Sequence, residues 1–145
     1  MPQAISNKTQ TQTQQRNGII KYLMIFVGVS GCFSVLFSAW LAHAGLSLPV
    51  NVQLTLKTAL QYQLLHTLAL LIVLVWATTR VSANSSCKLL LAVCIAFAVG
   101  ILCFSVSIYI KTFFSITIIG KLTPIGGISL AVAWLLLSIE GKRNL

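Results

Sequence analysis

The sequence predicts an all-α, polytopic membrane protein folded as a bundle of four transmembrane helices. Two observations lead to this fold class. Four long apolar stretches fill most of the 145 residues, and hydrophobic residues make up 57% of the chain while charged residues make up only 8%. A soluble domain carries about 25% charged residues. This chain has too few polar side chains to cover so much apolar surface in water.

Each apolar stretch is long enough for one helical span. A helix needs roughly 20 predominantly apolar residues to cross a hydrocarbon core about 30 Å thick. An isolated apolar run has to satisfy its backbone hydrogen bonds internally in lipid, and therefore has to be a helix. In the last stretch, Pro124 falls in the first turns, where its missing N–H costs least. We expect a transmembrane domain over residues 19–140, with spans at about 20–42, 58–79, 89–110 and 119–139.

Three segments lie outside these spans. Residues 1–18 are rich in Gln and Thr and nearly free of apolar side chains, so we expect a disordered tail. Residues 141–145 form a second, short tail. Between the first two spans, we expect residues 45–56 to lie along the membrane surface.

The distribution of Lys and Arg predicts the orientation. Both termini of a four-span protein lie on one side of the membrane, and cytoplasmic loops carry an excess of positive charge. The side with the termini would hold seven of the ten basic residues, and the opposite side would hold Lys57, Lys111 and Lys121. We therefore expect both termini in the cytoplasm.

The formal net charge of +9 bears on the partners. This orientation and anionic lipid headgroups together explain it. A nucleic-acid binder gathers its basic residues on one soluble face, and the sequence predicts no soluble domain. We therefore expect the lipid bilayer as a partner and no nucleic acid, and the sequence leaves open a membrane-protein partner or a homo-oligomer.

Small residues recur at every fourth position in three of the spans. Such stripes let helix backbones approach closely in lipid, and they predict close packing in a compact bundle. The stripes are Ser30, Ser34, Ser38 and Ala42; Ala92, Ala96 and Gly100; and Gly127 and Ala131, with Ser129 and Ala133 alongside.

The outer half of the second span is unusually polar. At about 100° per residue, Tyr62, Gln63 and His66 fall on one face, and Gln61 falls on a different face. His43 ends the first span on the same outer side. Polar and ionisable side chains at membrane depth usually face the bundle interior or a water-filled cavity, so this region is a candidate site.

The third and fourth spans add hydroxyl groups to this candidate site. Ser105 and Ser107 lie within an apolar run, and Thr123 opens a Thr-Pro-Ile-Gly-Gly segment. Two interpretations stay open: the polar side chains bond across helices and hold the bundle together, or they line a site for a small molecule or ion. The candidate residues are His43, Gln61, Tyr62, Gln63, His66, Ser105, Ser107 and Thr123.

The sequence offers little for catalysis or metal binding. Glu140 is its one acidic residue, so paired-carboxylate catalysis is excluded. The chain has no P-loop, dinucleotide-binding glycine pattern, nucleophile elbow or C-x-x-C pair. Two His residues without a carboxylate or Cys partner are a thin ligand set. We expect no enzyme activity, no cofactor and no metal.

Four segments resemble the domain-of-unknown-function 423 family in their residues and in their order along the chain. They are Ala-Trp-Leu-Ala-His-Ala-Gly-Leu at 39–46, Gln-Tyr-Gln-Leu-Leu-His within 57–71, Gly-Ile-Leu-Cys-Phe-Ser-Val-Ser-Ile-Tyr at 100–109, and Thr-Pro-Ile-Gly-Gly at 123–127. The chain departs from the family pattern at the extra Ala44 and at Val106, where the family usually has Gly. The resemblance covers about residues 20–140, and it implies a four-helix protein of the bacterial inner membrane without implying a reaction.

The sequence thus favours a non-enzymatic integral membrane protein, either an accessory subunit or a small binding protein. The alternative is a minimal transporter or channel that uses the polar outer half of the second helix and the bend at residues 123–127. A wide hydrated cavity lined by Tyr62, Gln63, His66 and Ser105 would favour transport. A dry interior in which these side chains bond to one another would favour the non-transporting protein.

Overall fold

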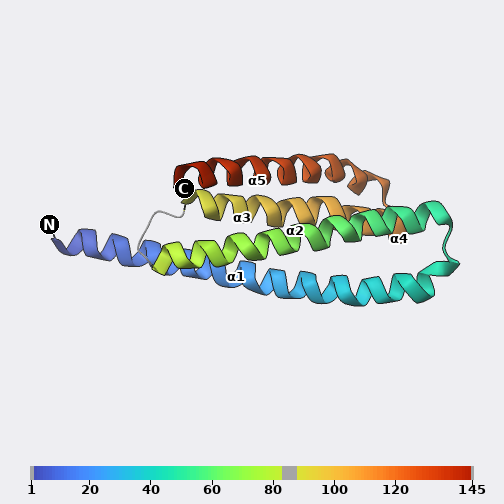
Figure 1. Cartoon of the computed structure of the whole chain (residues 1–145), viewed down its shortest axis with the longest axis horizontal. Coiled ribbons are helices and arrows are strands. Elements are labelled where there is room, and N and C mark those ends of the chain that lie inside the picture. Colours follow the sequence, from blue (N-terminus) through green and yellow to red (C-terminus); the bar gives the residue numbers. More distant parts are fainter. Residues whose placement is uncertain (1, 83–87, 145) are drawn as a thin grey trace.

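The computed structural model describes residues 2–82 and 88–144, and helices dominate this part of the chain (Figure 1). Short turns connect or interrupt the helices. The elements in order are α1 (Pro2–His43), the 3₁₀ turn η1 (Ala44–Ser47), α2 (Val50–Ser82), α3 (Lys88–Ile101), the π turn η2 (Leu102–Val106), α4 (Ser107–Phe114), the 3₁₀ turn η3 (Thr117–Lys121) and α5 (Leu122–Asn144).

Four helical stretches are long and apolar enough to cross a membrane. They are Gln14–Ser47, Val50–Arg80, Lys88–Phe114 and Thr117–Arg143, and the third joins α3, η2 and α4 into one span. The predicted fold class, an all-α bundle of four transmembrane helices, is confirmed. Each stretch is longer than the apolar run that revealed it, because polar residues at both ends continue the helix.

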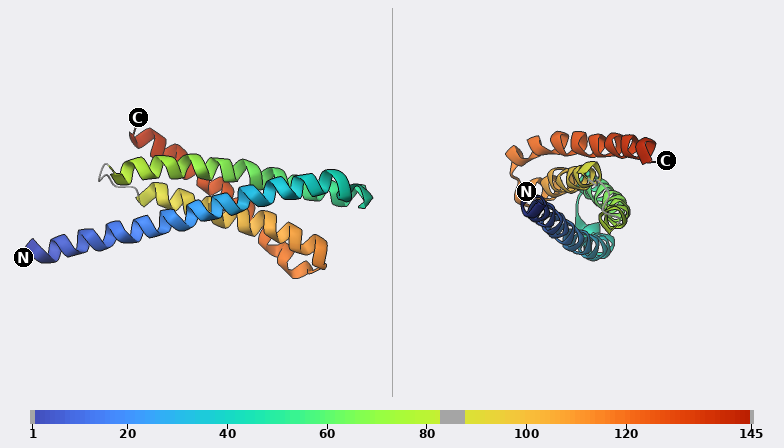
Figure 2. Two further views of the ribbon diagram at one scale, coloured as in Figure 1. Left: turned by 90° about the horizontal axis from the view of Figure 1, so that it is seen from below. Right: turned by 90° about the vertical axis from the view of Figure 1, so that its left-hand side faces the viewer.

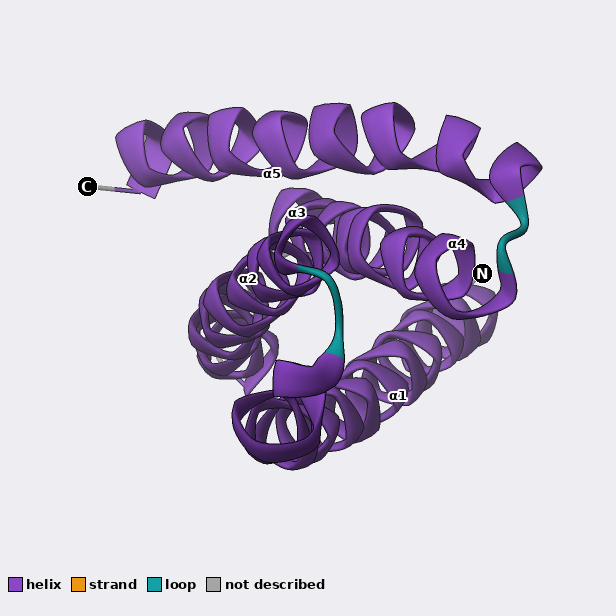
Figure 3. Ribbon diagram, turned by 90° about the vertical axis from the view of Figure 1, so that its right-hand side faces the viewer, coloured by secondary structure: helices purple, strands orange, loops and turns teal. Residues whose placement is uncertain are grey.

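The first three spans surround a common axis and the fourth lies outside them (Figure 3). α1 and α2 run antiparallel and pack side by side, α2 also packs against α3, and α5 packs along α3 and η2. Both chain ends lie at one end of the bundle, called the inner end here (Figures 1 and 2). The turns η1 and η3 lie at the opposite, outer end.

Apolar side chains fill the bundle in two clusters. The larger one occupies the inner half between α2 and α3, where Leu70, Leu74, Leu90 and Phe97 are fully buried. A smaller cluster around Leu41, Leu56, Ala59 and Tyr109 fills the outer half. The outward faces of α1 and α5 are also apolar, as expected for helices that contact lipid chains.

Aromatic side chains gather toward both ends of the bundle. Near the outer end, the ring of Phe37 lies 5.4 Å from that of Trp40 and 5.0 Å from that of Tyr109, and Trp40 lies 5.8 Å from Phe113. These contacts join α1 to α4. Toward the inner end, the indole of Trp76 lies under the guanidinium of Arg80 at 5.9 Å. Aromatic rings gather at membrane–water interfaces, so their positions agree with a transmembrane orientation of the bundle.

Two expectations for the connecting segments differ from the structure. The tail at residues 1–18 is helical from Pro2 onward, whereas the sequence predicts disorder. Extending a stable helix adds one backbone hydrogen bond per residue without a new nucleus, and Gln, Lys and Arg are good helix formers. Residues 45–56 do not form a separate surface segment, because α2 begins at Val50 and only η1 precedes it.

α5 approaches the backbone of the π turn closely at Gly126. A Cβ atom added to Gly126 would collide with the backbone nitrogen of Phe104 and lie 2.7 Å from the carbonyl carbon of Cys103. The same atom on Gly127 would meet only the ring of Phe104, at 3.9 Å. The predicted stripe of small residues therefore packs through the neighbouring face: Gly126 and Ala133 are buried, whereas Ala131 is exposed.

The stripe on α1 is used only in part. Ser30 and Ser34 are buried against α2, but Ser38 and Ala42 are exposed. The two outer positions point away from α2 because residues spaced by four drift by about 40° per step around a helix of 3.6 residues per turn. A long stripe therefore cannot stay in one straight contact.

Candidate functional site

Gln63 lies at the centre of a hydrogen-bonded cluster that joins three spans. Its side-chain amide nitrogen donates to the hydroxyl of Ser30 at 3.1 Å and to the carbonyl oxygen of the same residue at 3.3 Å. Its side-chain carbonyl accepts a hydrogen bond from the Tyr109 hydroxyl at 2.9 Å. Both Gln63 and Tyr109 are buried. One residue of α2 thus ties α1 to α4 at membrane depth.

A second contact between α1 and α2 extends this cluster. The hydroxyl oxygens of Ser30 and Thr67 lie 2.8 Å apart, and the Ser34 hydroxyl donates to the Ser30 carbonyl at 2.8 Å. All three side chains are buried. We call Ser30, Gln63, Thr67 and Tyr109 the amide cluster. Every member has a partner on another helix, as buried polar groups in lipid require.

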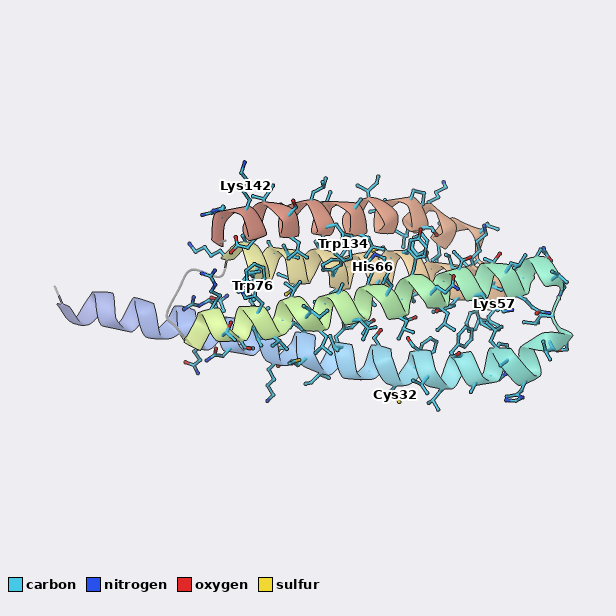
Figure 4. All side chains as sticks on the ribbon, in the orientation of Figure 1. Cys32, Lys57, His66, Trp76, Trp134 and Lys142 are labelled. Carbon is cyan, nitrogen blue, oxygen red and sulfur yellow. The ribbon has the colours of Figure 1, made fainter. Side chains whose placement is uncertain are left out.

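His66 lies on the other side of α2, among aromatic rings. Its Nδ1 atom lies 2.7 Å from the backbone carbonyl of Tyr62. Since a carbonyl oxygen only accepts, this nitrogen carries a proton and donates it. The imidazole lies 5.9 Å from Phe97 and 6.3 Å from Trp134, measured between ring centroids. Figure 4 shows His66 and Trp134 close together in the middle of the bundle.

Tyr62 belongs to the same aromatic group. Its ring stacks on Phe104 of the π turn with centroids 4.6 Å apart. Tyr62 and His66 are therefore neighbours, as the helical spacing predicts, with their centroids 5.6 Å apart. Gln63 bonds in a different direction, toward α1 and α4. The single polar face predicted for the second span is two faces that contact different helices.

The hydroxyl groups of the third span serve separate contacts. Ser105 donates to the Ala59 carbonyl of α2 at 2.9 Å. The hydroxyl oxygens of Ser107 and Thr123 lie 2.7 Å apart and join α4 to the start of α5. Ser107 also donates to the Phe104 carbonyl at 2.9 Å. Ser105, Ser107 and Thr123 are thus used in holding helices together, each at a different point.

Two of the predicted residues lie away from all of these contacts. His43 is exposed at the end of α1, and Gln61 is exposed on α2. Two residues of the amide cluster, Ser30 and Thr67, were missed as site residues. Ser30 was recognised only as a small packing residue. Thr67 follows His66 directly, and its position one turn after Gln63 was the available signal.

A groove opens between α1 and the third span. It has a volume of about 330 Å³ and almost entirely apolar walls, and Ser30, Gln63 and Tyr109 of the amide cluster are among its lining residues. Val106, which stands where the resembled family usually has Gly, is part of its wall. We call this opening the lateral groove; its lining residues are Phe26, Val29, Ser30, Phe33, Gln63, Ile101, Leu102, Val106 and Tyr109.

A larger opening lies near the outer end. It has a volume of about 570 Å³ and is shared by the start of α2, α4 with the adjoining π turn, and the segment that leads into α5. We call it the outer hollow; it is lined by Asn51, Val52, Thr55, Phe104, Ile108, Lys111, Thr112, Gly120, Thr123, Pro124 and Gly127.

The side chains around the lateral groove and the outer hollow suit the binding of a ligand better than the catalysis of a covalent reaction. The polar groups of the lateral groove are an amide, a phenol and a hydroxyl, which can orient a ligand by hydrogen bonds. Among residues 2–82 and 88–144, no three His, Cys, Asp or Glu side chains gather in a way that would hold a metal ion. His66 is surrounded by rings and lines neither the lateral groove nor the outer hollow.

Comparison with known proteins gives one family match, over residues 37–127, to the family described as Protein of unknown function (DUF423). A UPF0382 membrane protein of Haemophilus influenzae is 36% identical over 126 residues, which cover 86% of this chain and 95% of that protein. The UPF0382 inner membrane protein YgdD of Escherichia coli K12 is 28% identical over 85% of this chain and 91% of its own length.

A third bacterial relative is matched over its whole length. The UPF0382 membrane protein YwdK of Bacillus subtilis is 29% identical over 128 residues, which cover 87% of this chain and all of that protein. No solved structure matches the chain. The family match includes Gln63, Tyr109 and Gly126 but not Ser30.

Proposed function

The chain belongs to the DUF423 family of membrane proteins, and we propose that it is a non-enzymatic, multi-pass inner-membrane protein that binds a small amphipathic molecule from the lipid phase. The binding site in this proposal is the lateral groove. The observation that carries it is a groove of about 330 Å³ with almost entirely apolar walls, and with the buried pair Gln63 and Tyr109 among its lining residues. The inner-membrane location follows the description of the Escherichia coli relative.

The position of the groove favours a ligand that arrives through the bilayer. Val29, Phe33 and Leu102 line it and are also exposed on the outside of the bundle, where lipid chains would contact them. An apolar body would replace lipid chains in the groove without exposing polar groups of the protein. Water-soluble ligands would have to cross the same apolar rim, so the rim selects against them.

The amide cluster defines the polar part of the ligand. The side-chain nitrogen of Gln63 is already used as a donor to Ser30, and the Tyr109 hydroxyl donates to Gln63. The phenol oxygen and the side-chain carbonyl oxygen each keep a lone pair that can accept another hydrogen bond. We therefore assign the groove a ligand that donates, such as an apolar molecule with one hydroxyl group.

Transport is the alternative, and one observation favours it. The outer hollow joins the start of α2 to the Thr123–Gly127 segment, where the sequence places a transport path. The inner half of the bundle argues against a path, because Leu70, Leu74 and Phe97 fill it without exposure. Gln63 and Ser105 bond to other helices instead of facing a common cavity. These contacts support a binding protein over a transporter.

The basic residues support a cytoplasmic location for both termini in this proposal. Lys142 lies at the inner end and Lys57 at the outer end in Figure 4. The inner end holds seven of the ten Lys and Arg residues, and the outer end holds Lys57, Lys111 and Lys121. An excess of positive charge marks the cytoplasmic side of membrane proteins.

The test is to fill the groove and measure ligand binding. Val106→Trp places an indole in the groove, and Val35→Trp adds the same group to α1 at an exposed site outside the groove. Native mass spectrometry of the protein in mild detergent should detect a bound hydroxyl-bearing amphiphile in wild type and Val35→Trp. We expect Val106→Trp to lack it while retaining the wild-type helical signal in circular dichroism.

Two results would count against the proposal. Equal occupancy in Val106→Trp and Val35→Trp would place the ligand elsewhere on the bundle. The same absence of bound amphiphile in all three proteins, after titration with long-chain alcohols, would leave the groove without a lipid-phase ligand. The accessory-subunit interpretation would then take its place, with the groove as the contact for a partner helix.

A further inference from the structure

We infer that the outer hollow binds the phosphate group of an anionic phospholipid, with Lys111 as the charged contact. This inference does not rest on the lateral groove or on its ligand. It starts from an unbalanced charge in a cavity that has both polar and apolar walls. The volume of about 570 Å³ lies within the range of small-molecule sites, roughly 300–1,000 Å³.

The positive charge of Lys111 has no carboxylate side chain near it. The sequence contains one acidic residue, Glu140. That residue lies near the far end of α5, and the 18 helical steps from Leu122 to Glu140 span roughly 27 Å at 1.5 Å per step. Lys57 and Lys121 add two more positive charges at the outer end. The counter-charge for this end of the bundle has to come from outside the chain.

The side chain of Lys111 lies beside Gly120 of η3. A Cβ atom on Gly120 would lie 3.3 Å from Cδ of Lys111 and 3.7 Å from its Nζ atom. The lysine side chain therefore lies along the one residue of η3 that has no side chain. The exposed lysine side chain thus runs alongside η3 at the wall of the cavity.

The other walls match a phospholipid headgroup and the glycerol region beneath it. Asn51 and Thr112 contribute an amide and a hydroxyl, which can donate to phosphate oxygens. Val52, Ile108 and Pro124 provide an apolar wall. A free phosphate ion would use only the polar side, whereas a phospholipid would use both. Thr112, which lines the cavity, is followed by Phe113 and Phe114, both exposed at the end of α4.

The two N-terminal helix ends at the cavity add to the attraction. α2 begins at Val50 and α5 at Leu122, and Asn51 and Thr123 near these ends line the hollow. The N-terminal end of a helix carries a partial positive charge that favours anions. These dipoles are supplementary here, because the cavity and the lysine carry the assignment.

The experiment compares lipids that differ in headgroup charge but have the same chains. Full-length protein in a neutral detergent is titrated with dioctanoyl phosphatidylglycerol or dioctanoyl phosphatidylcholine, and the melting temperature gives an apparent Kd. Lys111→Met removes the charge and keeps an unbranched side chain beside Gly120, and Lys111→Arg restores the charge. Lys57→Met is the control, because Lys57 lies at the same end but does not line the hollow.

We expect phosphatidylglycerol, and not phosphatidylcholine, to raise the melting temperature of wild type, Lys57→Met and Lys111→Arg. In Lys111→Met the apparent Kd should be about tenfold weaker, the effect of one hydrogen bond to a charged group. The melting temperature of Lys111→Met without lipid shows that this variant folds. Sodium phosphate at matched ionic strength should not reproduce the shift.

Three results would overturn the inference. Equal stabilisation by both lipids would show that the headgroup charge is not recognised. An equal loss in Lys57→Met and Lys111→Met would indicate general surface charge instead of a site. A shift with sodium phosphate alone that depends on Lys111 would make a free anion the ligand, and not a lipid.

Discussion

The hydroxyl of Tyr109 donates a hydrogen bond to the side-chain carbonyl of Gln63 across 2.9 Å, between α4 and α2. Neither residue could make this bond within its own helix. Gln63 uses its other end to bond Ser30 of α1. This pair is therefore the point at which the outer halves of three spans are tied together.

Removing this hydroxyl should weaken the bundle measurably. Tyr109→Phe keeps the ring contacts with Phe33 and Phe37 and deletes one hydrogen bond between helices. Such bonds contribute about 0.6 kcal/mol on average in membrane proteins, with a maximum of about 1.7 kcal/mol. We expect Tyr109→Phe to lower the free energy of unfolding in detergent by an amount within this range. Tyr62→Phe is the control, because Tyr62 is 44% exposed and keeps its stack on Phe104. An equal loss in both variants would show that the bond contributes nothing specific.

The contact between α5 and the π turn predicts that alanine substitution lowers stability at one of two adjacent glycines and not at the other. Gly126→Ala places a methyl group against the backbone of Phe104 and Cys103, which cannot move independently of the helix. Overpacking of this kind costs about 1–3 kcal/mol. Gly127→Ala makes an ordinary contact at 3.9 Å and should leave the melting temperature nearly unchanged. The reverse order of the two melting temperatures would mean that α5 packs through its other face.

The assignment of inner and lipid-facing residues can be checked with two phenylalanines. Phe97 of α3 is fully buried against α2 and α5, whereas Phe114 is 71% exposed at the end of α4. A buried Phe→Ala change costs about 3–5 kcal/mol when a cavity remains. We expect Phe97→Ala to lose most of its folded population in a detergent denaturation series, and Phe114→Ala to resemble wild type. Similar stability of the two variants would contradict the packing of α5 on α3.

The orientation proposal can be checked by cysteine labelling in whole cells. Replacement of Cys32, Cys87, Cys94 and Cys103 by Ser or Ala gives a background without native thiols. Ser47→Cys lies in η1 at the outer end, and Lys142→Cys lies near the end of α5. A membrane-impermeant maleimide should label the first variant in intact cells and the second only after permeabilisation. The opposite pattern would place both termini outside the cytoplasm.

The spans could be predicted from the sequence because membrane insertion depends on length and hydropathy along one stretch of chain. The four predicted stretches each lie within a helix or helices of the structure. The importance of Gln63 was also predictable, because a polar side chain in an apolar span has to find a partner. Its partners were not predictable, since Ser30 and Tyr109 are 33 and 46 residues away in the chain.

The predictions about helix faces that the structure contradicts depend on how each helix is rotated relative to its neighbours. Helical spacing groups Tyr62, Gln63 and His66, yet Gln63 bonds α1 and α4. The ring of Tyr62 stacks on the π turn, and the ring of His66 contacts α3 and α5. A face of about 100° is wide enough to contact two neighbours, and only the bundle decides which residue meets which helix. The choice of Gly126 over Gly127 has the same origin, because both residues satisfy a small-residue pattern and they differ by one step of rotation.

The π turn at Leu102–Val106 has a consequence for the register of the third span. A π turn holds one residue more than an α turn, so the side chains after it are rotated by about 100° relative to an uninterrupted α-helix. The residues on either side of Tyr109 are both isoleucines, Ile108 and Ile110. If the same residues continued as an uninterrupted α-helix through this turn, Ile108 would take the place of Tyr109 and the Gln63 amide would lose its phenol partner. The extra residue of the π turn thus decides which side chain of α4 meets Gln63 of the neighbouring span.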